Sequence, residues 1–120
     1  KKNLNKLAKQ TTEKSKRIQK KRFMGKAAVK QIQIDCDWTD STKSNFFEFL
    51  KFLKKEMPGY VISSTLRIHQ VKFKERTGVP PVDRVVLMAY NVGDLGDVEE
   101  MNSIISNKVT AQYLERLEDY

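Results

Sequence analysis

The chain has 120 residues, of which 39% are hydrophobic, and it carries a formal net charge of +8. This length is enough for one small hydrophobic core, so we expect a single domain. A single cysteine excludes an intrachain disulfide and a zinc site made of cysteines, and the sequence has no apolar run of membrane-spanning length. The chain begins without methionine and stops within a helical pattern, so we expect it to be part of a longer protein.

The positive charge lies at the start of the chain. Residues 1–30 contain 12 Lys and Arg against Glu13 alone, a net charge of +11, whereas residues 31–120 contain 11 against 14 acids, a net charge of −3. Small and apolar side chains recur there at helical spacing: Leu4, Leu7, Ala8, Thr11 and Ile18. They predict a basic amphipathic helix, with a linker at 23–30.

This basic helix has two interpretations. It is either an arm that binds a polyanion or the solvated outer face of a packed helix, and we favour the solvated face. No aromatic residue precedes Phe23, and no nucleic-acid-binding signature accompanies the lysines, so a nucleic-acid partner is disfavoured.

A β-strand is predicted next, near 31–38. Side chains alternate along a strand, so one face carries Gln33, Asp35, Asp37 and Thr39, and the other carries Ile32, Ile34, Cys36 and Trp38. We expect Cys36 to act as a small buried hydrophobic residue. Trp38 is expected in the core, with the alternative that it folds over a pocket at the end of the strand.

The following elements alternate between helix and strand. Residues 39–42 provide N-cap chemistry for a helix that ends at Pro58-Gly59 and buries Phe46, Phe47, Leu50, Leu53 and Met57. Further strands are predicted near 60–70 and 84–91, joined by a crossover at 72–83 that is neither regular helix nor central strand around 77–81. A loop at 92–96 leads into helical sequence from residue 98. This order predicts parallel strands, in either a small open α/β sheet or part of a (β/α)8 barrel.

Two strand ends resemble those of the chitinase-like glycoside hydrolases of family 18, whose fourth strand carries D-x-x-D-x-D-x-E and whose sixth carries M-x-Y-D. The matching residues are Asp35-Cys36-Asp37-Trp38-Thr39 and Met88-Ala89-Tyr90-Asn91. The chain also resembles bacterial proteins of unassigned function with D-x-D-W-T, T-L-R-x-H-Q and G-V-P-P motifs, here at 35–39, 65–70 and 78–81. The resemblance covers residues 31–120. It implies an α/β fold with strands four to six of a TIM barrel, residues 1–30 as an outer helix and linker, and missing strands supplied by other residues or another chain.

Three departures from the family pattern bear on activity. Thr39 replaces the glutamate that acts as general acid in the family, and a hydroxyl group cannot replace a carboxylic acid in that role. The first Asp of the motif is Ile32, and the Asp of M-x-Y-D is Asn91. The resemblance therefore implies a retained sugar pocket without the chitinase mechanism.

The candidate site follows from these motifs. Asp35 and Asp37 are the candidate catalytic acids, about 7 Å apart along one face of a strand. Arg67, His69, Tyr90 and Asn91 are candidate substrate-binding residues at the neighbouring strand ends. Structural alternatives stay open for three of them. The acids can simply pair with Arg67, and His69 can be a hydrogen-bonded structural residue.

Two functions of different class remain. The favoured one is a glycoside-hydrolase-like barrel that binds or processes a carbohydrate at the carboxyl ends of the strands, and whether it is an enzyme is left open. The alternative is a non-catalytic module whose basic helix recognises a polyanion. We expect no cofactor and no metal, and the resemblance alone implies an extracytoplasmic location. Binding of a sugar responds little to salt, whereas binding of a polyanion weakens steeply with it.

Overall fold

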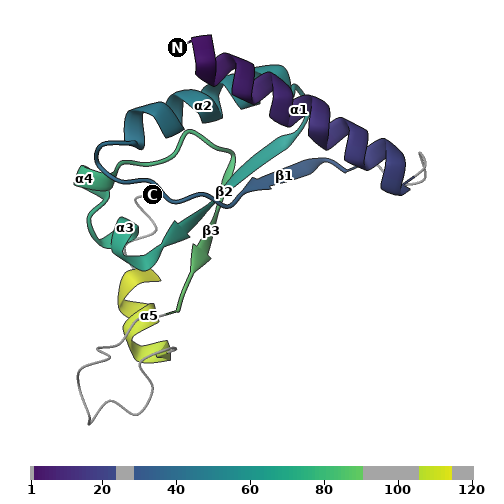
Figure 1. Ribbon diagram of the computed structural model, residues 1–120. Helices are drawn as coiled ribbons and strands as arrows, with labels where there is room; N and C mark the ends of the chain where they lie inside the picture. Colours follow the sequence, from purple (N-terminus) through teal and green to yellow (C-terminus); the bar gives the residue numbers. More distant parts are fainter. Residues whose placement is uncertain (1, 24–28, 91–105, 115–120) are drawn as a thin grey trace.

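The computed structural model describes residues 2–23, 29–90 and 106–114, which form a mixed α/β unit around a three-stranded parallel sheet (Figure 1). The strands are β1 (Gln31–Ile34), β2 (Val61–Arg67) and β3 (Arg84–Met88), in the order β1-β2-β3. The helices are α1 (Lys2–Phe23), α2 (Lys43–Glu56), α3 (Ile68–Lys72), α4 (Lys74–Thr77) and α5 (Asn107–Leu114). The parallel α/β arrangement predicted from the alternating elements is confirmed.

The register gives the sheet one apolar and one largely polar face. Ile32 pairs with Ile62, and Leu66 pairs with Leu87, which places these side chains on the same side of the sheet. On the opposite side, Gln33 lies beside Ser63. The alternation predicted for residues 31–34 is therefore confirmed.

Helices α1 and α2 lie side by side along the apolar face (Figure 1). The buried residues of α2 recur at helical spacing and pack against the sheet, and Ala8 of α1 completes this core at 0% exposure. The predicted helix before Pro58 and Gly59 is confirmed, although Phe47 is only partly buried. Thr42 occupies the N-cap position, and its hydroxyl accepts the Thr39 N–H at 2.9 Å.

The packing of α1 differs in part from the predicted stripe. Ala8 and Thr12 are buried, whereas Leu7 and Ile18 remain 49% and 44% exposed. The helix rests on the core through a face shifted by about a quarter turn from the predicted one. Of the described helices, none is both long enough and apolar enough to cross a membrane.

Three strand boundaries were predicted too late, the third of them because β3 ends at Met88 rather than near residue 91. The first strand ends at Ile34 rather than near residue 38, and Cys36 is exposed, so its expected burial is wrong. The second ends at Arg67 and continues directly into α3, because the buried side chain of Gln70 reaches back and accepts the Arg67 N–H at 2.8 Å. That side-chain bond begins a helical turn where the sequence had indicated continued alternation.

Asp83 fixes the amino ends of the strands. One of its carboxylate oxygens accepts from the Lys54 ammonium at 2.5 Å, and the other accepts the Ile62 N–H at 2.9 Å. The Asp83 N–H in turn donates to the Ile62 carbonyl at 2.8 Å. Lys54 first, and then the Ile62 N–H, lower the pKa of Asp83 below its ordinary value of 3.8.

The variant Asp83→Asn is expected to be less stable at neutral pH by about 1 kcal/mol, because an amide still accepts from Ile62 but no longer attracts Lys54. A lowered folded-state pKa stabilises the protein above the ordinary pKa, and this stabilisation is lost as pH falls through the folded value. Urea unfolding of both proteins from neutral pH down to below the ordinary aspartate pKa measures this. A difference that stays constant across that range would contradict the assignment.

Candidate functional site at the carboxyl ends of the strands

Three pairs of polar side chains connect β1 and the residues after it to β2, on the face away from α1 and α2. Gln31 donates its amide to the Ser63 hydroxyl at 3.1 Å. Further along, the Thr65 hydroxyl donates to one carboxylate oxygen of Asp35 at 2.9 Å. Asp37 and Arg67 form an ion pair at the carboxyl end. The chain therefore keeps this polar alternation after β1 itself has ended.

The two candidate acids have different surroundings. Asp37 is neutralised by Arg67, and the two side chains are 45% and 49% exposed, so the pair contributes only about 0.2–1 kcal/mol to stability. Asp35 accepts a neutral hydroxyl group and is not ion-paired to any residue in the described part of the chain. The structural alternative, in which Arg67 pairs with an acid, is confirmed for Asp37.

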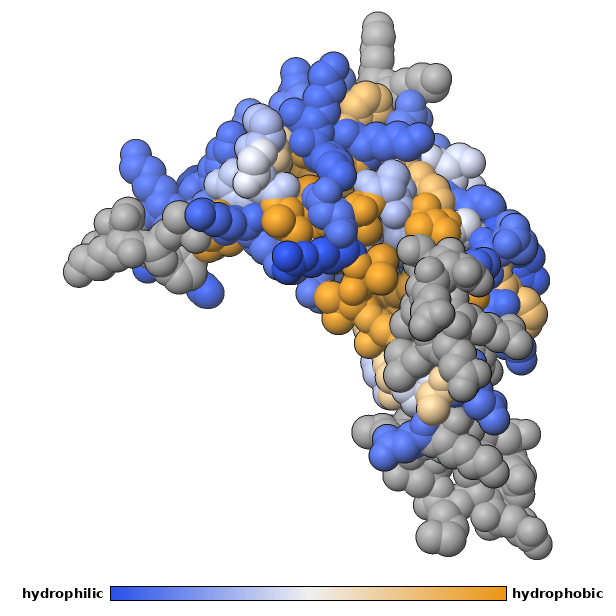
Figure 2. Space-filling view, turned by 180° about the vertical axis from the view of Figure 1, so that it is seen from behind, coloured by the Kyte–Doolittle hydropathy of each residue, from blue (hydrophilic) through white to orange (hydrophobic). Residues whose placement is uncertain are grey.

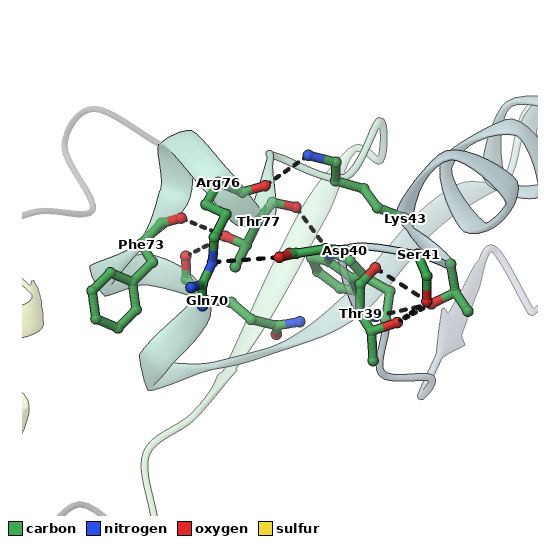
Figure 3. Close-up of polar contacts among 10 residues, drawn as sticks. Thr39, Asp40, Ser41, Lys43, Gln70, Phe73, Arg76 and Thr77 are labelled. Carbon is green, nitrogen blue, oxygen red and sulfur yellow. Dashed lines mark hydrogen bonds and ion pairs between the residues drawn. The ribbon is translucent and has the colours of Figure 1, made fainter.

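The segment after β1 and the first residue of α2 are held against α4 by three polar contacts (Figure 3). The indole N–H of Trp38 donates to the Thr77 carbonyl at 2.8 Å, and the Lys43 ammonium donates to the Arg76 carbonyl at 2.6 Å. Asp40 lies 3.8 Å from the Arg76 guanidinium. Trp38 is 6% exposed and stacks on Phe46 at 5.3 Å, so its predicted place in the core is confirmed.

Gln70 is a fully buried polar residue beside the site. It is 0% exposed, its side-chain oxygen holds the Arg67 N–H, and its carbonyl accepts the Thr77 hydroxyl at 2.8 Å. Its side-chain nitrogen has no hydrogen-bond partner among the described residues. Gln70 therefore holds the backbone of Arg67 in place. In this way it positions the Arg67 side chain for its ion pair with Asp37.

Of the remaining predicted residues, the two that the structure describes, His69 and Tyr90, do not contact the aspartates. His69 lies on α3 and is exposed, so its expected place at a strand end, in the alternation of Arg67, is wrong. Tyr90 is 47% exposed, and its hydroxyl donates to the Met88 sulfur at 3.6 Å. Asn91 lies outside the described residues. Thr39 shares hydrogen bonds with the hydroxyls of Ser41 and Thr42 at 2.9 and 3.2 Å.

Thr65 and Gln70 were not predicted from the sequence. Thr65 falls on the same alternation as Arg67, so its face was visible in the sequence, but its pairing with Asp35 depends on the register of β1 against β2. The alternation did not indicate a capping role for Gln70, because it predicted that the strand runs to about residue 70. In the structure β2 ends three residues earlier, at Arg67.

The described residues contain no group of three or more side chains arranged to hold a metal ion. What the site offers is a solvent-facing set of charged hydrogen-bonding groups, the carboxylates of Asp35 and Asp37 and the guanidinium of Arg67, with the buried Thr65 hydroxyl bonded to Asp35. Such groups suit a ligand rich in hydroxyls. No protein-family model, no curated protein and no solved structure matches this chain.

Proposed function

We propose that this chain is the middle of a chitinase-like (β/α)8 barrel and that it binds a carbohydrate at the carboxyl ends of its strands. The observation that carries this proposal is the convergence of Asp35, Asp37 and Arg67 on the face away from α1 and α2, at the strand ends where barrels place their ligands. Three neighbouring parallel strands with α1 and α2 on one face also fit consecutive strands of such a barrel.

The open edges of the sheet support the barrel. In the described part of the chain, β1 and β3 each pair on one side only, with β2, and Val86 is 40% exposed on the face that a barrel would enclose. Unpaired strand edges are a liability in an isolated protein. Further strands, from other residues of the protein or from a second chain, would pair with these edges.

The surroundings of Thr39 argue for binding rather than chitinase-type hydrolysis. That mechanism needs a carboxylic acid to protonate the leaving oxygen, and general acid catalysis contributes about 10²- to 10⁴-fold to rate. Thr39 has a hydroxyl group in this position. That hydroxyl hydrogen-bonds to the hydroxyls of Ser41 and Thr42, just before α2. Asp37 is ion-paired with Arg67, so one of its carboxylate oxygens is already engaged by the protein.

Both an acidic and a basic group of this site can bind the hydroxyl groups of a sugar. The Asp35 carboxylate has one oxygen that is free of Thr65 and can accept two hydroxyl groups, and the Arg67 guanidinium retains donors beyond its contact with Asp37. Charge-assisted hydrogen bonds of this kind contribute about 1.5–3 kcal/mol each.

The test is a glycan array followed by calorimetric titration of the best ligand, beside a panel of glycosidase substrates. Asp35→Ala is expected to weaken binding at least about tenfold, which corresponds to about 1.4 kcal/mol. The control Asp40→Ala removes an exposed carboxylate from the same segment, one that faces Arg76 instead, and should change affinity less than about twofold.

Two results would contradict the proposal. Absence of binding to any glycan would exclude the carbohydrate function. Turnover of N-acetylglucosamine polymers that Asp37→Asn abolishes would show that the site hydrolyses its ligand and that Asp37 takes the place of the missing acid.

A further inference from the structure

The outer face of α1 carries an unusual concentration of unpaired positive charge. Seven exposed cations lie on it: Lys6, Lys9, Lys14, Lys16, Arg17, Lys20 and Lys21. At 100° per residue they occupy one continuous sector of about 160°, opposite the face that Ala8 and Thr12 bury in the core. Between Lys6 and Lys21 the helix runs for about 22 Å.

These cations have no partners within the described part of the protein. Each ion pair found among the described residues lies elsewhere, on α2, on α4 or beside β2, and none involves α1. Glu13, the only acid in this helix, does not pair with them. A solvated helix face usually intersperses charges of both signs, so a face of one sign creates a field that attracts an anionic partner.

We propose that the outer face of α1 binds an anionic polysaccharide. This partner is independent of the sugar site on the opposite side of the sheet, so the two proposals can fail separately. The geometry favours a flexible chain, because the cations spread over a wide sector of a convex rod. A flexible polymer can follow that curvature, whereas a flat bilayer touches only a narrow part of it.

The composition of the face disfavours the two rival anionic partners. A membrane-bound helix buries a continuous apolar face in the lipid, but the cationic sector of α1 contains no apolar side chain, and the exposed Leu7 and Ile18 beside it are two isolated residues. No nucleic-acid-binding signature accompanies these lysines in the sequence, which disfavours a nucleic acid. The helix also offers no aromatic side chain within this sector for stacking on unpaired bases.

Heparin, as a sulfated probe, and polygalacturonate, as a carboxylated one, test the proposal by calorimetry on the 120-residue chain at several salt concentrations. Binding releases counterions, so log K should fall linearly with log salt. The double variant Lys9→Gln/Lys20→Gln is expected to lower affinity about tenfold at low salt and to reduce the slope by about 1 to 2, because two contacts are lost. Glu13→Gln should tighten binding.

The matched control is Lys51→Gln/Lys55→Gln, which removes the same number of exposed charges from α2. It should change affinity less than about twofold. The α1 assignment is overturned if both double variants weaken binding equally, because net charge alone would then explain it. If a DNA duplex or phosphatidylserine vesicles bind as tightly as heparin or polygalacturonate, the assignment of a polysaccharide partner is overturned. Absence of binding to both heparin and polygalacturonate overturns it as well.

Discussion

Replacing Trp38 with alanine is expected to lower the free energy of unfolding by about 3–5 kcal/mol, the largest effect of any substitution proposed for this chain. The indole is 6% exposed, stacks on Phe46 and meets the edge of Phe47 at 5.5 Å. Its N–H also satisfies the buried Thr77 carbonyl. Since small domains are stable by only about 5–15 kcal/mol, this variant loses a large share of its stability.

The variant Trp38→Phe separates packing from hydrogen bonding. It keeps an aromatic ring against Phe46 but leaves the Thr77 carbonyl without its donor, so we expect a smaller loss of about 1–3 kcal/mol. Far-UV circular dichroism in urea measures both, because Trp38 is the only tryptophan and its fluorescence disappears with it. A loss below about 1 kcal/mol for Trp38→Ala would show that this aromatic cluster does not hold the segment after β1 to the end of α4.

Gly78→Ala is expected to destabilise the fold by about 2–4 kcal/mol, for two physical reasons. Gly78 has φ +76° and ψ 167°, a combination that residues with a side chain rarely adopt. An added Cβ would also stand 3.0 Å from the Phe47 ring and 3.2 Å from the Lys43 side chain. This residue follows α4 directly, so the strain falls on the segment that accepts the Trp38 hydrogen bond.

Gly59 is the matched control for the Gly78 prediction. It has a similar φ of +82°, but nothing lies within 4 Å of the position that a Cβ would occupy, so Gly59→Ala should cost only the backbone strain of about 1–2 kcal/mol. Urea unfolding of the two variants gives the difference. Equal losses would mean that the Phe47 ring moves aside and that packing around Gly78 contributes nothing.

Part of the surface of the molecule is apolar. On the side that Figure 2 shows, apolar side chains gather at the middle of the molecule, with hydrophilic side chains around them. Several large hydrophobic residues remain exposed in the described part of the chain, among them Phe73, whose ring lies near the cationic groups of Lys72 and Arg76 at 5.4 and 5.2 Å. A second layer of protein over part of this surface is consistent with the proposed barrel.

The order of the strands and of the helices α1 and α2, and the two faces of the first strand, could be predicted from the sequence alone, whereas α3 and α4 were not. Alternation along residues 31–34, the β-branched residues of β2 and the helical spacing in α2 predicted a parallel α/β unit whose apolar face packs on helices. The pattern also indicated that Arg67 could neutralise an acid. These features are local, because they depend on the periodicity of side chains in a single element.

Where each strand ends and which side chains meet depend instead on contacts between elements. Gln70 ends β2 by capping Arg67, and this moves His69 onto a helix, away from the strand-end position the sequence had indicated. Thr65 meets Asp35 only because β1 and β2 pair in one register. Contacts between residues about 30 positions apart depend on how whole elements dock, which no local pattern encodes.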